Sequence, residues 1–179
     1  MNIFYIHPDP KICAQQHNNT HSNKMCTEYA QLMSTAHRVL DGEKRIGLTQ
    51  SGRRQQQWFF NDKHKDDLIY KASHVNHPSN VWTRHSHSNY NWLYEMWCHL
   101  LDEYTYRYGK IHGCSKLKDI LKECPKNIRQ GEFTQPTPAM PDEFIVKDSV
   151  ESYRMYYNKA KSHIGQWKNR SVPEWYTGV

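Results

Sequence analysis

The chain has 179 residues, of which 37% are hydrophobic and 13% aromatic, and its formal net charge is +6. This length suits one domain with a real core, and six Trp, twelve Tyr and five Phe exclude a disordered composition. The positive charge favours polyanionic partners such as nucleic acid. No segment approaches the roughly 20 apolar residues of a membrane span. The first residues also lack the pattern of a signal peptide.

The cysteine and glycine patterns restrict which metal and cofactor sites we expect in the chain. The five cysteines are an odd number without a CxxC pair, which favours reduced thiols and a cytoplasmic protein. Cys13, His17, His21 and Cys26 do not have the spacing of a known zinc knuckle or finger, so we expect no metal. No Walker or Rossmann glycine pattern is present, and we expect no other cofactor.

Hydrophobic periodicity and capping residues predict a mainly α protein, a single-domain helical bundle over residues 1–179 with about five helices and an aromatic core. The first seven residues (MNIFYIH) are expected to form a strand or an extended lead buried against the core. The first expected helix begins at Pro10 with Asp9 as its cap, and the second runs from a Thr20 cap to Leu40. A helix is expected to begin at Val81 after a Ser79 or Asn80 cap, and a longer one to run from a Ser88 cap to Tyr108, before Gly109. The last two are expected from Lys116 to Glu123 and from Asp148 or Ser149 to about Trp167.

Residues 42–71 look like an insertion into this bundle. They begin with a basic, glycine-punctuated stretch that allows a hairpin turning at 50–52, and the aromatic triplet 58–60 follows. Lys44, Arg53 and Arg54 suit contacts with a phosphate backbone, and the aromatic triplet suits an unstacked base. The alternative is a mobile polar loop that its aromatic residues anchor, and the composition favours neither.

The segment 13–40 (CAQQHNNTHSNKMCTEYAQLMSTAHRVL) contains the best candidate site. On a helix, six polar residues spaced three or four apart share one face: His17, His21, Lys24, Glu28, Gln31 and Thr35. An apolar stripe that includes Met25, Leu32 and Ala36 runs beside them. Two imidazoles, an amine and a carboxylate in one row suit acid–base chemistry. The alternative is a solvated helix face on which some of the twelve histidines cluster by chance.

These groups could break the bond between a base and a sugar. A Glu beside His and Lys can stabilise an oxocarbenium-like centre, or activate water or an amine to displace a base. A nucleic-acid N-glycosylase must also take a base out of the stack, which suits a basic protein. We therefore expect Glu28, His21, Lys24 and His17, on and just before the helix 20–40, to form the catalytic group.

Motifs along the chain resemble a group of small phage proteins. The shared motifs are M-N-I-F, H-x-x-K-M…E-x-x-Q-L, N-H-P-S…W and E-Y-T-x-R-Y-G-K-x-H, at residues 1–4, 21–32, 76–82 and 103–112, with MPDEF and YRMYY…WKNRSVPEW after them. The similarity covers nearly the whole chain outside 42–70.

That group is more distantly similar to the pyrimidine-dimer DNA glycosylases of the phage endonuclease V type, which are small, basic and all-helical. In that family a helix carries His-x6-Glu with a catalytic Glu, and His21 and Glu28 have the same offset here. The family's nucleophile is the α-amine of a small residue exposed by removal of Met. Here the bulk of Asn2 favours retention of Met1, and residues 27 and 31 are not the family's arginines. We therefore expect Lys24 to replace the terminal amine, or Glu28 to activate water.

The resemblance implies a DNA N-glycosylase that acts on a damaged or modified pyrimidine base in double-stranded DNA, in the host cytoplasm and without a membrane partner. Two alternatives stay open: a phage protein that binds nucleic acid or a host factor without chemistry, and an enzyme that acts on a free nucleotide. The expected substrate or nucleic-acid contacts are His37, Lys44, Arg53, Arg54, Asn76, His77, Trp82 and Arg107.

Overall fold

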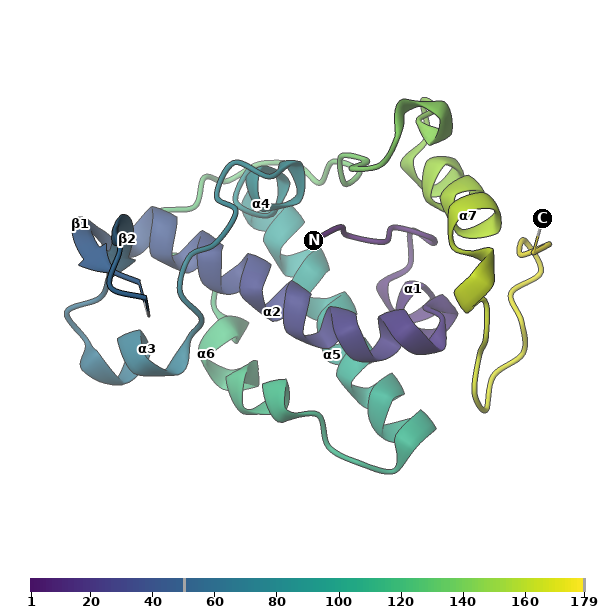
Figure 1. The fold of residues 1–179 in the computed structure, drawn as a ribbon, viewed down its shortest axis with the longest axis horizontal. Coiled ribbons are helices and arrows are strands. Elements are labelled where there is room, and N and C mark those ends of the chain that lie inside the picture. Colours follow the sequence, from purple (N-terminus) through teal and green to yellow (C-terminus); the bar gives the residue numbers. More distant parts are fainter. Residues whose placement is uncertain (50, 179) are drawn as a thin grey trace.

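The computed structural model describes residues 1–49 and 51–178. These residues are mainly α-helical, as the periodicity predicts (Figure 1). The α-helices that they form are α1 (Pro10–Gln16), α2 (Asn19–Asp41), α3 (Lys63–Leu68), α4 (Pro78–Thr83), α5 (His87–Tyr108), α6 (Lys118–Lys122) and α7 (Ser149–Ala160). The strands are β1 (Glu43–Leu48) and β2 (Arg54–Phe59), and the short 3-10 helices are η1 (Gly113–Leu117), η2 (Asp142–Phe144) and η3 (Ser162–Ile164). None of the described helices has the length and apolar character needed to cross a membrane.

Three predicted helix boundaries are confirmed by their capping geometry. Asp9 accepts a hydrogen bond from the Ile12 amide at 2.9 Å at the start of α1, and Asp148 accepts one from the Glu151 amide at 3.0 Å at the start of α7. Gly109 ends α5 with a φ of +64°, a conformation that glycine adopts without strain.

Other boundaries differ from the prediction because a nearby polar side chain takes the capping position. Asn18 rather than Thr20 caps α2, and Ser86 rather than Ser88 caps α5. The ring of His77 caps α4, which therefore begins earlier than expected. A side-chain acceptor at any of several neighbouring positions can satisfy the free amides of a first turn, so sequence alone places these ends within a few residues.

Two further helices differ in form. The segment expected to be one helix over 116–123 begins as η1, where the His112 ring accepts a hydrogen bond from the Cys114 amide, and continues as α6. Helix α7 ends at Ala160 instead of near Trp167. The helix α3 was not expected, because its sequence KHKDDL buries no residue and so shows no apolar period.

Helices α2 and α5 cross at the centre of the molecule and together supply the largest share of the core (Figure 1). The indole nitrogen of Trp97 on α5 donates to the Cys26 carbonyl of α2 at 2.7 Å. Of the apolar residues that recur at helical spacing along α5, Tyr104 is half-buried and the others are buried: Tyr90, Leu93, Trp97, Leu100 and Leu101. The aromatic character of the core is confirmed in this part of the fold.

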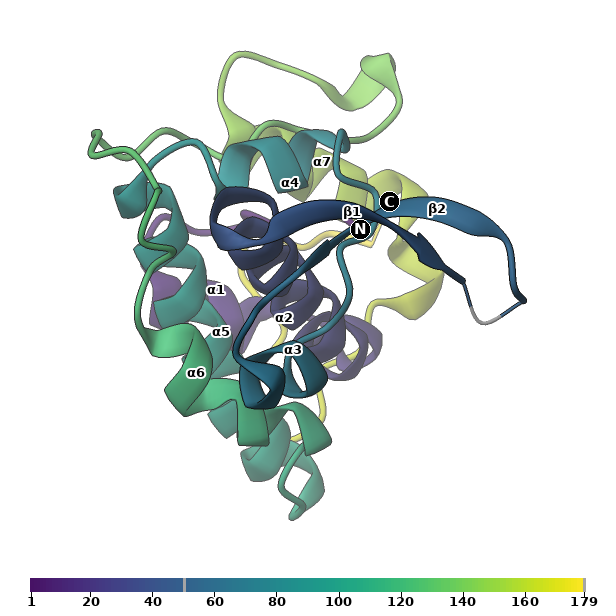
Figure 2. The ribbon, with the colours of Figure 1, turned by 90° about the vertical axis from the view of Figure 1, so that its left-hand side faces the viewer.

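Strands β1 and β2 form an antiparallel hairpin within the segment expected to be an insertion. Glu43 lies opposite Phe59 and Leu48 lies opposite Arg54. Gln50 of the expected turn lies outside the described residues, and Gly52 has a φ of +78°. Figure 2 shows the hairpin projecting away from the helices.

The buried guanidinium of Arg38, near the end of α2, holds the base of this hairpin. Its nitrogens donate to the carbonyls of Trp58, Asp66, Ile69 and Tyr70 at 2.6–2.9 Å, and to the Asp66 carboxylate at 2.6 Å. Because a buried charge is tolerated only when it is well paired, these contacts fix the segment 58–70 to α2.

Candidate functional site

Reactive groups gather in a small cleft where the N-terminus meets α2 and α7. Its volume is about 190 Å³, below the 300–1,000 Å³ of pockets that take drug-sized ligands, so it suits one ring or sugar. The lining residues are Met1, Asn2, Phe4, His21, Lys24, Glu28, Tyr156 and Lys161. Three of the four expected catalytic residues thus lie together.

Glu28 holds one amine on each carboxylate oxygen. The α-amine of Met1 lies 3.5 Å from Oε2, and the Lys24 ammonium lies 3.1 Å from Oε1. The side chains of Glu28 and Met1 are 17% and 10% exposed, whereas that of Lys24 is 62% exposed. Met1 is therefore the more enclosed of the two residues that supply an amine.

The N-terminal segment reaches Glu28 because buried side chains hold its backbone. The Phe4 amide donates to the Tyr29 hydroxyl at 3.1 Å, and the Cys13 thiol donates to the Phe4 carbonyl at 3.3 Å. The Arg154 guanidinium donates to the Ile6 carbonyl at 2.9 Å. These contacts replace the hydrogen bonds that a strand would receive from a neighbour. The expected buried lead is confirmed in its extended form.

His17 lies outside the cleft and contacts two of the groups that hold the N-terminal segment. Its Nδ1 is 2.7 Å from the Cys13 carbonyl and its Nε2 is 2.8 Å from the Tyr29 hydroxyl. Because a carbonyl only accepts, Nδ1 has the proton and Nε2 accepts from Tyr29. Burial lowers the pKa of His17 to about 4, so the ring is neutral at pH 7.

His21 lines the cleft as a neutral ring. Its ring stacks on Phe4 with 3.9 Å between the centroids, and its Nδ1 is 2.6 Å from the Tyr157 hydroxyl. Burial, followed by the charges of neighbouring basic groups, lowers the pKa of His21 to about 2. The ring therefore positions its neighbours and does not supply a proton as imidazolium at neutral pH.

The first turn of α4 and its cap His77 lie near the N-terminal residue of the cleft. Asn80 places its amide nitrogen 3.5 Å from the Met1 sulfur and donates to the carbonyls of Ser73 and His74, each at 2.9 Å. Burial, and then the charge of the N-terminal amine, lowers the pKa of His77. Among the expected substrate contacts, His77 is therefore close to the ion pair of Met1 and Glu28.

Three other expected contacts lie inside the fold. His37 is 3% exposed and hydrogen-bonds the Tyr90 hydroxyl at 2.9 Å, and Trp82 is 4% exposed and donates to a backbone carbonyl. Arg107 is 1% exposed and pairs with Glu103 at 2.6 Å. These side chains are occupied by internal partners, which a sequence pattern does not reveal.

The remaining expected contacts are exposed. Asn76 lies in the turn before α4, whereas Lys44, Arg53 and Arg54 lie on the hairpin. The helix rises 1.5 Å per residue, so about 20 Å separates Glu28 from the end of α2 where the hairpin begins. The structure thus divides the predicted site into a cleft and a separate basic projection.

Sequence reasoning missed the part of the cleft that other segments supply. Tyr156 lies in α7 and Lys161 directly follows its last residue, with the Lys161 ammonium 5.1 Å from the Tyr156 ring centroid. The YRMYY motif contains Tyr156 but does not indicate that this side chain faces the cleft, and Lys161 lies outside the quoted motifs. The apolar residues around Phe4 do indicate burial of the N-terminal segment, and burial brings the α-amine of Met1 into the site.

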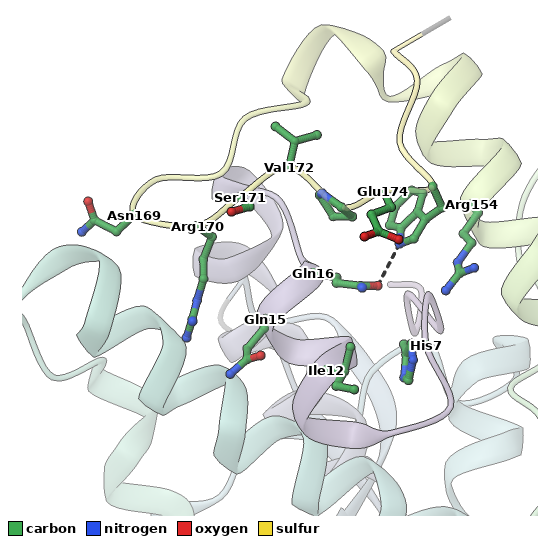
Figure 3. Close-up of a pocket in the computed structure, with 12 residues that line it drawn as sticks. His7, Ile12, Gln15, Gln16, Arg154, Asn169, Arg170, Ser171, Val172 and Glu174 are labelled. Carbon is green, nitrogen blue, oxygen red and sulfur yellow. Dashed lines mark hydrogen bonds between the residues drawn. The ribbon is translucent and has the colours of Figure 1, made fainter.

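A larger hollow of about 660 Å³ lies between α1 and the C-terminal segment (Figure 3). Trp175 closes one side, donating to Gln16 at 2.8 Å. The arginines there have partners, since Arg154 donates to a backbone carbonyl and Arg170 pairs with Glu103 at 2.8 Å. This hollow offers less reactive chemistry than the cleft at Glu28.

Within residues 1–49 and 51–178, no three His, Cys, Asp or Glu side chains are grouped as a metal ion would require. No family model, curated protein or solved structure matches the chain.

Proposed function

We propose that this protein is a DNA N-glycosylase in which Glu28 and the α-amine of Met1 form the reacting pair. The observation that supports this proposal best is their 3.5 Å contact inside a cleft. A carboxylate beside an amine can accept the proton that the nitrogen loses and can stabilise positive charge on a sugar carbon.

The reaction proceeds in balanced steps. The amine nitrogen forms a bond to the sugar carbon C1′ while the bond to the base breaks, and the electron pair leaves with the base. Glu28 accepts the proton from the nitrogen, and the base takes a proton from water. The nitrogen lone pair then opens the sugar ring, and the C4′ oxygen takes the proton from Glu28, which gives a protonated imine at C1′ and a hydroxyl at C4′. Water hydrolyses the imine to the aldehyde and frees the amine.

Other residues of the cleft have supporting roles in this proposal. Lys24 is exposed enough to contact a phosphate while it pairs with Glu28. Lys161 adds a second cation at the rim. The neutral rings of His21 and His17 are positioning residues that hold Phe4 and the N-terminal segment. Lys24 is the alternative nucleophile.

The proposed substrate is a damaged or modified pyrimidine in double-stranded DNA, in the host cytoplasm. A net charge of +6 favours a polyanion. A cleft that admits one ring requires the nucleotide to leave the base stack. The spacing of His21 and Glu28, shared with the pyrimidine-dimer glycosylases, supports the same chemistry.

The test is base release from four duplexes: ultraviolet-irradiated, uracil-containing, hydroxymethyl-modified and plain. Intact mass first establishes that the assayed protein begins with Met1. Glu28→Gln should lower the release rate on the accepted duplex by about 100-fold or more. The matched control Glu151→Gln, at an exposed position of α7, should leave the rate unchanged.

Each other outcome rejects the proposal. Full activity of Glu28→Gln would remove Glu28 from the chemistry. Tight binding without release from any duplex would favour a binding protein. Neither binding nor release, with turnover of a free nucleotide, would favour the nucleotide enzyme.

A further inference from the structure

The β1–β2 hairpin presents one open face. Residues directly opposite each other in antiparallel strands point to the same side. The register therefore groups six residues, which we call the Ile46 face: Lys44, Ile46, Leu48, Arg54, Gln56 and Trp58. Ile46 is 64% exposed and Leu48 is 66% exposed.

The opposite face of the hairpin is covered by its own side chains. A Cβ atom on Gly47 would lie 2.9 Å from Cζ of Phe59 and 2.7 Å from the Gln57 side-chain oxygen, so the ring of Phe59 occupies that space. The Phe59 ring also has the guanidinium of Arg45 at 5.5 Å and the ammonium of Lys71 at 5.1 Å. The Ile46 face is thus the one available to a partner.

The hairpin is strongly cationic on and beside this face. Lys44, Arg53 and Arg54 are exposed, and none has a carboxylate partner within the described residues. The hairpin carboxylate of Glu43 pairs instead with Arg45 at 3.0 Å. Two aliphatic side chains therefore lie between Arg54 near the turn and Lys44 at the base of the hairpin, where the Lys44 ammonium is 5.5 Å from the Trp58 ring centroid.

We propose that the hairpin enters the major groove of duplex DNA with the Ile46 face toward the base edges. A two-stranded ribbon fits the major groove, where aliphatic side chains can contact thymine methyl groups. Lys44, Arg53 and Arg54 contact the phosphates that border the groove. This inference rests on the proposed function, which supplies duplex DNA as the ligand.

The placement of the hairpin allows one duplex to contact it and the cleft together. The N-terminus lies between the hairpin and α7 along the long axis in Figure 1. Figure 2 shows the hairpin and part of α7 projecting to the right, whereas α5 and α6 lie toward the left. The distance of about 20 Å along α2 corresponds to about six base pairs at 3.4 Å each. The clamp at Arg38 keeps the hairpin base fixed to α2 over this distance.

The proposed phosphate contacts of the hairpin cations are tested by measuring the binding of a duplex of about 20 base pairs. Fluorescence anisotropy gives the affinity over a range of salt concentrations. All proteins contain Glu28→Gln, so that base release does not interfere. Lys44→Gln/Arg53→Gln/Arg54→Gln should weaken binding on the order of 100-fold at about 0.15 M salt and make the slope of log K against log salt less negative by about 2.7. The matched control, Lys110→Gln/Lys116→Gln/Lys122→Gln, removes three exposed charges near α6 and should change neither quantity to this extent.

Ile46→Ser/Leu48→Ser tests the orientation. It should weaken binding without changing the salt slope, because no phosphate contact is lost. Replacement of thymine by uracil in the duplex removes the methyl groups, and should weaken binding of the protein with Ile46 and Leu48 but not of the double variant.

Equal effects of the two triple variants would overturn the inference, and so would a duplex affinity independent of Ile46 and Leu48. In either case, base release that depends on Glu28 would leave the proposed function standing. Conversely, hairpin-dependent binding by a protein that releases no base would reject the proposed function and retain the hairpin as a DNA-binding element.

Discussion

Acidification from about pH 7.5 to about pH 5.5 should remove about 4 kcal/mol from the free energy of unfolding, because three histidines are buried as neutral rings. His17, His21 and His37 are 0%, 5% and 3% exposed. Burial is the first cause that lowers their pKa values, to about 4, about 2 and about 4.

The sign follows from proton binding in the two states. An unfolded histidine takes a proton near pH 6.5, whereas these folded rings stay neutral until about pH 4 or below. Between these values the unfolded chain binds more protons, so stability is complete above about pH 6.5 and falls as the pH falls. At about pH 5.5 the contribution of each ring to the free energy of unfolding is lower by about 1.4 kcal/mol, and the three contributions together are lower by about 4 kcal/mol.

Urea unfolding followed by tryptophan fluorescence at the two pH values measures this loss. His37→Gln should reduce the loss to about 3 kcal/mol, because one buried ring no longer contributes. His64→Gln, at an exposed position of α3, should leave it at about 4 kcal/mol. A loss below about 1 kcal/mol, or an equal loss in His37→Gln, would refute the argument from buried neutral rings.

Tyr29→Phe removes the hydroxyl shared by the Phe4 amide and His17, and should lower the unfolding free energy by about 3 kcal/mol as well as the rate of base release. An unchanged urea midpoint would show that this hydroxyl does not hold the N-terminal segment. Arg38→Met removes the guanidinium donor from four carbonyls and from the Asp66 carboxylate, which keeps the Phe60 amide and the Lys71 ammonium, and it should cost about 3 kcal/mol and expose the segment 58–70 to limited proteolysis. Proteolysis at the same rate and sites as in the unsubstituted protein would contradict the clamp.

A helix can be predicted from local sequence when its own segment contains both the apolar period and the residues that begin and end it. Helix α5 has a clear apolar period, and Gly109 marks its end. Helix α3 buries nothing, so its formation depends on the Asp62 cap and on the clamp at Arg38, which is distant in sequence. Capping positions were missed where adjacent polar residues compete.

The candidate site also has one part that the sequence predicts and one part that depends on the tertiary fold. The spacing of His21, Lys24 and Glu28 on one helix face is visible in the sequence and is sufficient to place them together. Whether such a face is solvated depends on what packs over it. Here Phe4 and Tyr157 cover His21, so the ring is a neutral, enclosed group instead of an exposed acid or base. The position of a chain terminus is likewise a property of the tertiary fold.

The most direct test of the central claim is to trap the covalent intermediate. Duplex DNA with one abasic aldehyde is incubated with the protein and borohydride, which reduces an imine to a stable amine, and peptide mass spectrometry locates the adduct. We expect the adduct on the α-amine of Met1, at unchanged position in Lys24→Gln and strongly diminished in Glu28→Gln. An adduct on Lys24, or equal trapping by Glu28→Gln, would contradict the assignment of Met1 and Glu28 as the reacting pair.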